Sequence, residues 1–415
     1  MTDGPTDGQD DQTTALAVPE RAAEPAARTR VLLLGSGELS RELAVALRHL
    51  GARVIAGGDD REHPRAPAHT VADESLTIPL TDAAELTAAI ERLRPDYVVT
   101  ATDAVAADAL DALAGRAHPE LVPNARAVRL TSDREALRRL AADELGLPTA
   151  PFWFVGSVGE LRAVAAHAGF PLLVKPVSGR GHSVVAGPDD VEPAWQRAVG
   201  DRPGAPQRAM AETVVEVEFD VTLIVVRSEG PQGPLTEFCS PIGHRDADGV
   251  VLESWQPQQI SAAAVDAAKS IAARIVKALG GRGVFSVELM IKGDEVYFAD
   301  VTARPHPSAW VTLRSQRLSA FELQARAVLG LPLDTMMMSP GAAHGIEPGP
   351  GAAAPTAAAL TAALGVPESD LRVFGPGAAS PHKLGVALAT APDVRTARDR
   401  ARQVAAALNM RDSGG

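Results

Sequence analysis

Large apolar residues occupy every odd-numbered position from Phe285 to Ile291, and Ser286 and Glu288 lie between them. A strand points successive side chains to opposite faces. The pattern therefore predicts a strand with one apolar face and one face that can carry chemistry.

A return strand is predicted over residues 296–301, after a turn formed by residues 292–294. If those three residues form the loop, residue 288 lies opposite 298 and residue 286 opposite 300. Glu288 and Asp300 would then share one face of the hairpin, a diagonal step apart. Crowded carboxylates repel, and Mg²⁺, which prefers oxygen ligands together with substrate phosphates, removes that conflict. The hairpin predicts a magnesium site, although a solvated hairpin with scattered acids has the same pattern.

Strands and helices alternate near the N-terminus. The apolar run Arg30–Leu34 is followed by leucines at helical spacing, and strands are predicted at 53–56 and 96–100 with a helix at 82–93 between them. This order is typical of a doubly wound parallel sheet. We therefore expect an α/β, Rossmann-like unit over residues 29–125.

An α+β unit is expected over residues 126–335. Short polar residues at 131–133 predict a helix start. Further elements are expected at 171–175, 183–186, 209–226 and 284–301 (strands) and at 262–279 (helix). Residues 341–354, rich in Gly, Pro and Ala, predict a loose connector inside a small β-rich C-terminal unit, 336–415.

Composition limits the class of protein. The 415 residues contain no apolar run long enough to cross a bilayer, and the net charge of −12 gives no electrostatic footprint for nucleic acid. Residues 1–28 carry six acids and two arginines without hydrophobic periodicity, which predicts a disordered acidic tail and not a signal peptide. The single cysteine, Cys239, excludes an internal disulfide and a thiolate cluster. These features favour a cytoplasmic protein without membrane or nucleic-acid partners.

A glycine-rich turn, Gly35–Gly37, lies between the first strand and its helix. Free N–H groups at such a helix start attract anions. Ser40 occupies the third glycine position of a dinucleotide fingerprint, and Asp59 or Asp60 could contact a ribose. An NAD-dependent dehydrogenase therefore stays an alternative, as does a tight turn without a ligand.

Lys175 ends an apolar strand. A lysine that points inward from a buried strand needs an anionic partner, whereas an edge-strand lysine would reach water. The glycine-rich loop 178–183 after it carries cationic and hydroxyl groups that could cover phosphates.

Three other places could contribute to a site. The strand predicted over residues 210–215 is followed by acids at Glu216, Glu218 and Asp220. It could offer backbone groups to an adenine and an acid to a ribose, although a solvated strand edge has the same pattern. His244 is expected to be a hydrogen-bonded structural residue, so no general base is assigned. Arg304, four residues past Asp300, could hold an anionic intermediate or bridge loop carbonyls.

The ordered combination of short motifs resembles the ATP-grasp superfamily and, more narrowly, the formate-dependent phosphoribosylglycinamide formyltransferases of purine biosynthesis. The resemblance runs from about Arg30 to Leu408, and its most specific string is Glu253–Gln259. The other motifs lie at 33–39, 137–142, 174–177, 241–245, 304–306 and 384–389. The resemblance implies a homodimeric, ATP- and Mg²⁺-dependent ligase whose ATP lies between two α+β subdomains. Formate would be phosphorylated, and the amine of glycinamide ribonucleotide would capture the formyl phosphate.

The resemblance also implies roles for individual residues. Glu288 and Asp300 would hold magnesium, and Arg304 and Lys175 would be catalytic. The residues implied to bind ATP are Arg134, Lys175, Ser178, Gly179, Arg180, Gly181, Glu212, Thr213, Val214, Val215 and Asp220. Those implied to bind the nucleotide substrate are Glu38, Leu39, Asp103, His382 and Lys383.

The chain departs from the family pattern mainly on the acceptor side. Ala101 stands where the family has a glutamate, for which Asp103 is close enough to substitute. Proline replaces an aspartate at 307 and a lysine at 376, and His382-Lys383 replaces two arginines that would grip phosphate. Two alternatives therefore stay open: a related ligase for another amine or carboxylate, and a nucleotide-binding protein with a decayed acceptor site.

Overall fold

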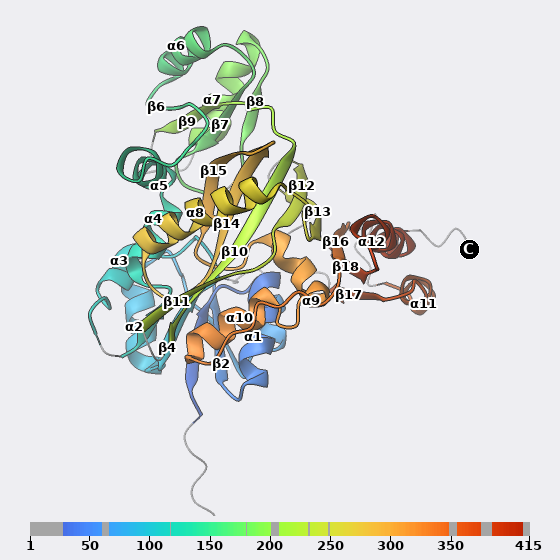
Figure 1. Ribbon diagram of the computed structural model, residues 1–415. Coiled ribbons are helices and arrows are strands. Elements are labelled where there is room, and N and C mark those ends of the chain that lie inside the picture. The colour runs from blue at the N-terminus through green and yellow to red at the C-terminus, as the bar shows by residue number, and fades with distance from the viewer. Residues whose placement is uncertain are drawn as a thin grey trace, which may run out of the picture.

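The computed structural model describes residues 28–59, 66–116, 118–179, 181–200, 207–230, 233–247, 250–347, 355–374 and 384–409. It contains a parallel sheet near the N-terminus, a small antiparallel sheet at the opposite end, and a long antiparallel sheet between them (Figure 1). Almost all of the predicted acidic tail lies outside the described residues, as do Asp60, Arg180, Pro376, His382 and Lys383. In the described part of the chain, no helix has both the length and the apolarity needed to cross a membrane.

The predicted Rossmann-like sheet is confirmed, with five parallel strands in the order β3-β2-β1-β4-β5. Its elements are β1 (Arg30–Leu34), α1 (Glu38–His49), β2 (Arg53–Gly58), η1 (Pro67–Thr70), β3 (Glu74–Thr77), α2 (Ala83–Leu93), β4 (Tyr97–Thr100), α3 (Ala107–Asp111) and β5 (Glu120–Val122). The strand order changes direction between β1 and β4, where Leu34 lies beside Thr100. Ligands of open parallel sheets bind at such a switch point, beyond the carboxyl ends of the strands.

The small sheet has the order β6-β9-β7-β8, so Lys175 lies on an interior strand and not at an edge. Its elements, with the helices that lead into it, are α4 (Ala125–Ser132), α5 (Arg134–Arg139), η2 (a π-helical turn, Leu140–Glu144), β6 (Phe152–Val155), α6 (Val158–Ala168), β7 (Leu172–Pro176), β8 (Ser183–Val185), η3 (Pro188–Asp190), α7 (Val191–Val199) and β9 (Ala209–Thr213).

The helix start predicted at 131–133 is correct only for its last residue. The Asp133 side chain accepts hydrogen bonds from the backbone N–H groups of Glu135 and Ala136 and caps α5. Thr131 and Ser132 instead end the preceding helix, α4, because their hydroxyls donate back to carbonyls of that helix.

The central sheet has nine strands and carries the predicted hairpin. Its strands are β10 (Phe219–Gly230), β11 (Gly233–Phe238), β12 (Ile242–Ala247), β13 (Val250–Gln256), β14 (Gly283–Lys292), β15 (Glu295–Thr302), β16 (Gly341–Ile346), β17 (Ser369–Val373) and β18 (Gly385–Thr390). The accompanying helices are α8 (Ala262–Leu279), η4 (Pro307–Val311), α9 (Thr312–Ser315), α10 (Ala320–Leu329), α11 (Ala357–Leu364) and α12 (Val394–Asn409).

The apolar face of β14 packs against α8, as the alternation predicts, through Phe285, Val287 and Leu289. On the other side of the sheet, α10 packs against α1 and joins the central sheet to the N-terminal unit. Helix α10 covers the second face of β14 near Val284, whereas Glu288 and Met290 farther along that face line a cleft.

The loose connector predicted over 341–354 is wrong for its first part, because Gly341–Ile346 is strand β16. β16 pairs with β13 and β18, so the C-terminal strands continue the central sheet. A Cβ on Gly341 would lie 3.0 Å from the Ser315 Cβ. The small residues that looked like a linker in the sequence allow this strand to lie close to its neighbours.

Candidate active site

A cleft of about 370 Å³ lies between the small sheet and the central sheet. The predicted site residues that line it are Asp103, Arg134, Lys175, Gly179, Gly181, Asp220, Glu288, Asp300 and Arg304. The other predicted site residues that the structure describes do not line the cleft: Ser178, Glu212, Thr213, Val214, Val215, Glu38 and Leu39. Residues more than 200 positions apart in the chain therefore meet at one site.

Glu288 on β14 lies directly opposite Asp300 on β15. This register differs from the predicted one. Lys292 pairs with Glu295, which leaves a two-residue turn, and Ala299 is an unpaired extra residue because Leu289 pairs with Phe298. The shorter turn and the bulge each shift the return strand by one residue, so Glu288 pairs with Asp300 and not with residue 298. Together they bring the two carboxylates closer than the predicted diagonal arrangement.

The pKa of Glu288 is raised to about 8, first by desolvation in the cleft and then by the negative charge of Asp300. Such a pair suits a hard divalent cation, because both groups offer oxygen and the cation removes their repulsion. Among the described residues, no group of three or more His, Cys, Asp or Glu side chains forms a metal site. The donor set therefore fits Mg²⁺ that takes its remaining ligands from phosphate oxygens and water.

Lys175 has the anionic partner that its position requires. Its Nζ donates to Glu212 Oε2 over 2.6 Å, and only 20% of the lysine side chain is exposed. Burial would raise the pKa of Glu212, but the charges of Lys175 and Arg138 bring it below its ordinary value. The Glu212 carboxylate is thus a buried ion-pair partner of Lys175. The alternative, in which Lys175 reaches freely into water, is wrong.

Arg134 lies beside the glycine-rich loop that follows Lys175. Its guanidinium donates to the carbonyls of Pro176 and Gly179, and its backbone N–H donates to Val177 O over 2.9 Å. Gly179 and Gly181 have φ values of +88° and +94°, which favour glycine. The first turn of α5 therefore holds the start of a loop whose backbone can approach a ligand closely.

Arg304 forms an ion pair with Asp103, which joins the central sheet to the N-terminal unit. The arginine is 5% exposed, and its Nε and Nη1 have no hydrogen-bond partner among the described residues. The alternative in which Arg304 bridges loop carbonyls is therefore wrong. A buried guanidinium with unused donors at the edge of a cleft can bind an anion.

Two histidines lie beside the carboxylates of Glu288 and Asp300. His306 Nδ1 accepts from the backbone N–H of Ser308, so its Nε2, 3.4 Å from Glu288 Oε1, is the nitrogen that faces the carboxylate. His244 lies with its ring centroid 5.7 Å from that of His306, and neither of its ring nitrogens has a partner among the described residues. The expectation of a hydrogen-bonded structural His244 is wrong. The local sequence did not reveal this position, because His244 reaches the cleft through the pairing of β12 with β10, where it lies beside Asp220.

Glu38, Leu39 and Asp103, which are predicted to bind the nucleotide substrate, lie around the switch point of the parallel sheet. Glu38 and Leu39 begin α1 after β1, and Asp103 follows β4. Gly35 has φ +125°, and a Cβ there would lie 3.3 Å from the carbonyl carbon of Ala101. The loops after β1 and β4 therefore touch, and Asp103 extends from this contact toward Arg304.

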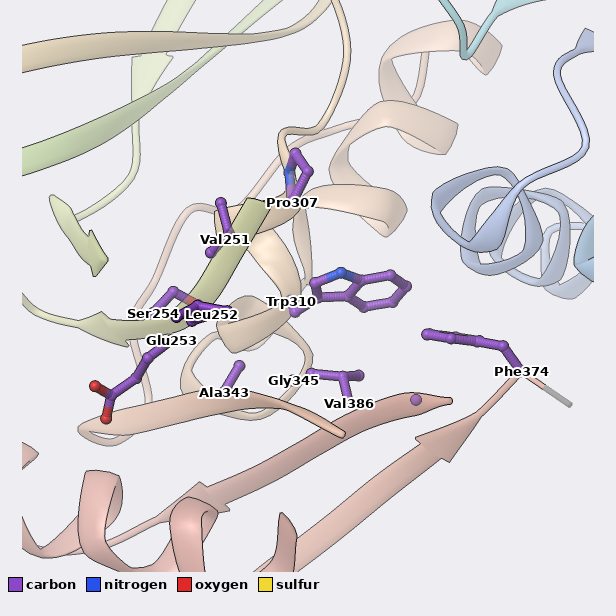
Figure 2. Close-up of a pocket in the computed structure, with 11 residues that line it drawn as sticks. Val251, Leu252, Glu253, Ser254, Pro307, Trp310, Ala343, Gly345, Phe374 and Val386 are labelled. Carbon is purple, nitrogen blue, oxygen red and sulfur yellow. The ribbon is translucent and has the colours of Figure 1, made fainter. Parts of the chain in front are cut away.

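A second cavity, shown in Figure 2, adjoins the cleft through Val251 and Pro307. The rings of Trp310 and Phe374, with centroids 5.3 Å apart, lie on its far side, and Glu253 points away from it. Its volume of about 10 Å³ is at the lower limit for one water molecule, so it cannot hold a substrate.

Two family models match the chain, the ATP-grasp domain over residues 140–321 and the model described as PurT, C-terminal, over residues 350–408. The formate-dependent phosphoribosylglycinamide formyltransferase of Corynebacterium glutamicum (strain R) is 46% identical over 401 residues, which cover 95% of this chain and 98% of that protein. The solved structure of glycinamide-RNase-transformylase T from Mycobacterium tuberculosis is 65% identical, with a TM-score of 0.78 over 92% of this chain and 100% of that one. A carboxyaminoimidazole ribonucleotide synthase from Aspergillus clavatus, complexed with ATP, shares the fold at 24% identity and a TM-score of 0.78, over 92% of this chain and 98% of that one.

Proposed function

The chain belongs to the family of formate-dependent phosphoribosylglycinamide formyltransferases, and from this premise we propose that it uses ATP to activate formate and passes the formyl group to the amine of glycinamide ribonucleotide. One observation carries the proposal. Two facing carboxylates, Glu288 and Asp300, form the floor of a cleft whose walls supply Lys175 and Arg134.

The first step needs alignment and charge neutralisation more than a protein nucleophile. A formate oxygen forms a bond to the γ-phosphorus, the bond from that phosphorus to the β–γ bridging oxygen breaks, and ADP leaves. Magnesium held by the carboxylate pair supplies charge neutralisation at the phosphates. Lys175 and Arg134 bind phosphate oxygens, and the loop that contains Ser178–Gly181 covers them.

The adenosine half of ATP would lie along β9 and β10. The backbone of Glu212–Val215 is the proposed adenine contact, because the Glu212 carboxylate is already engaged by Lys175. Asp220 is the proposed ribose ligand. Burial, and next the charge of Asp246, raises the pKa of Asp220, and a hydrogen bond from a ribose hydroxyl would offset that cost.

In the second step the amine nitrogen attacks the formyl carbon, the bond from that carbon to the phosphate oxygen breaks, and phosphate leaves while the nitrogen loses a proton. Arg304 is proposed to bind the phosphate of the formyl phosphate, since two of its nitrogens are unused. Asp103 is proposed to orient the amine, with Glu38 and Leu39 against the nucleotide. His382 and Lys383, outside the described residues, are proposed to bind its phosphate.

The test is ADP release measured with a coupled assay in the presence of formate, glycinamide ribonucleotide, both or neither. We expect sustained release only with both substrates. Release that is independent of both, or no release with both, would overturn the proposal. The second outcome, together with tight ATP binding, would favour a nucleotide-binding protein with a decayed acceptor site.

A second candidate is a ligase of this family for a different amine or carboxylate. Ala101 at the Gly35 contact and Pro307 in the cleft lining favour it, because both lack the carboxylate found in the family. Amines are to be compared at saturating ATP and formate, and carboxylates at saturating ATP and amine. A substrate that outperforms glycinamide ribonucleotide or formate would support this candidate. The dehydrogenase alternative is excluded by the family assignment, which covers 95% of the chain.

The homodimer that the resemblance implies and the cytoplasmic location that the composition favours stay predictions. Light scattering coupled to gel filtration tests the first, and fractionation of the source cells tests the second.

A further inference from the structure

Arg138 lies beneath the cleft and does not line it. Only 2% of it is exposed, and it occupies the buried side of the short helix α5. We infer that Arg138 is a positioning residue. It fixes the position of the Lys175 ammonium, which is proposed to bind ATP, and the register that places Asp300 opposite Glu288. The inference rests on the proposed nucleotide and metal sites, and it assigns a role to a side chain that contacts neither ligand.

The first contact of Arg138 is with Glu212. Arg138 Nη1 lies 2.9 Å from Glu212 Oε1, in an ion pair whose N–H does not point along the line of a hydrogen bond. The other oxygen of the same carboxylate accepts from Lys175. Glu212 is therefore shared between a buried arginine and the lysine of the cleft. Without Arg138, the carboxylate would be free to turn toward Lys175 alone and draw the ammonium away from the phosphates.

The second contact is with the bulge in β15. Arg138 Nη2 donates to the backbone carbonyl of Ala299 over 2.9 Å. Ala299 is the extra residue that places Asp300 opposite Glu288. A bulged residue has lost its ladder partner, so this hydrogen bond holds the backbone in the register that the metal pair needs.

The third contact fixes the guanidinium itself. Its carbon lies 5.4 Å from the centroid of the Phe152 ring on β6. One planar group thus joins β6 and β9 of the small sheet to β15 of the central sheet. Lysine cannot reproduce this, because its donors lie on a single nitrogen, whereas two separate guanidinium nitrogens contact Glu212 and Ala299.

The neighbouring arginine provides a matched control. Arg139 also lies over a β6 ring, 5.8 Å from the Phe154 centroid, and it bonds Glu135 one turn away. Its side chain is 57% exposed. Arg139→Met therefore removes the same kind of ring contact and the same charge without touching Glu212 or Ala299.

The test measures binding of a non-hydrolysable ATP analogue by calorimetry, together with the Mn²⁺ concentration that gives half-maximal binding. For Arg138→Met we expect the dissociation constant of the analogue to rise about tenfold, the size of one lost interaction between charged groups, and the Mn²⁺ half-saturation to rise as well. Arg139→Met should leave both values unchanged. Neither readout involves formate or the acceptor amine, so a failure of the proposed reaction does not alter them.

A double-mutant cycle separates the effect of Arg138 on Lys175, through Glu212, from its effect on the proposed metal-binding pair, through Ala299. In a Glu212→Gln background, Arg138→Met should weaken analogue binding at saturating Mn²⁺ by less than about twofold, because the effect that passes through Glu212 to Lys175 is already lost. The Mn²⁺ half-saturation should still rise, because the hydrogen bond to Ala299 is lost. If Arg138→Met does not fold, Arg138→Lys carries the test, with near-normal analogue binding and a raised Mn²⁺ half-saturation expected. Unchanged Mn²⁺ half-saturation in a folded Arg138 variant would overturn the inference.

Discussion

Glu288 lies directly opposite Asp300 across β14 and β15, with Ala299 excluded from the pairing. Desolvation in the cleft, and next the negative charge of Asp300, raise the pKa of Glu288. Lys175 and Arg134 offset this rise only in part. A bound cation would neutralise the remaining negative charge. The carboxylate pair that destabilises the metal-free protein would therefore give the site its affinity for the cation.

The substitution Glu288→Gln should abolish ADP formation and leave the fold intact. It removes one of two proposed metal ligands, and a loss of about a hundredfold or more in kcat is expected. Because it also removes a buried like-charge contact, the metal-free variant should melt no lower than the unsubstituted protein. Thermal unfolding without Mg²⁺ and the coupled assay measure the two effects. Full turnover in this variant would show that the metal assignment is wrong.

Metal affinity should fall as the pH falls from 8 to 6. The pKa of Glu288 is raised from 4.5 to about 8, so below pH 8 a proton competes with the cation for the carboxylate, at up to about tenfold in affinity per pH unit. The metal-free folded state binds more protons than the unfolded state between these pKa values, so its stability should decrease as the pH rises through that interval. Mn²⁺ titrations and melting curves at pH 6, 7 and 8 test both signs. Glu288→Gln should flatten both dependences, and a retained dependence would assign the proton elsewhere.

The spacing of apolar residues and the capping residues were enough to predict individual helices and strands. Helix α8 spans the predicted residues 262–279, because Ser261 caps its start and Gly280 ends it. The two faces of β14 also follow from alternation alone. The predicted register was wrong for two reasons. The turn has two residues and not three, and the bulge at Ala299 has no local signature, since an alanine in a strand does not reveal whether it is paired.

The partners of the site residues could not be predicted, because they depend on which strands become neighbours. Lys175 and Glu212 are 37 residues apart and meet only because β7 pairs with β9. The most specific sequence string, Glu253–Gln259, supports the fold at several points, and none of its residues lines the cleft. Gln256, for example, bonds the Ser240 carbonyl and the Ser315 hydroxyl.

Glu253→Gln should destabilise the attachment of the C-terminal helix α12 without affecting the chemistry. Arg398 donates to both oxygens of Glu253, over 3.0 and 2.9 Å, and Arg402 lies 3.0 Å away. We expect a loss of about 2 kcal/mol in the free energy of unfolding, measured in urea. Asp399→Asn, at an exposed acid that pairs with Arg402, is the control and should cost little.

The Glu253 carboxylate also makes the free energy of unfolding depend on pH. Burial would raise the pKa of Glu253, but the hydrogen bonds and charges of Arg398 and Arg402 bring it below 4.5. A depressed folded-state pKa contributes stability above the unfolded value, and this stability is lost as the pH falls through the folded value. The difference between the unsubstituted protein and Glu253→Gln should therefore shrink below about pH 4.5. A constant difference would show that packing, and not charge, carries the effect.

Asp103→Asn should separate acceptor use from ATP binding. The substitution weakens the ion pair with Arg304, the link between the N-terminal unit and the central sheet, but leaves Lys175, Glu288 and Asp300 in place. We expect KM for glycinamide ribonucleotide to rise about tenfold while KM for MgATP changes little, because a charged hydrogen bond to the amine is lost only on the acceptor side. Asp108→Asn, at an acid whose side chain is 92% exposed in the same unit, is the control. An equal rise in both KM values would mean that Asp103 supports the whole cleft through Arg304 and does not orient the amine.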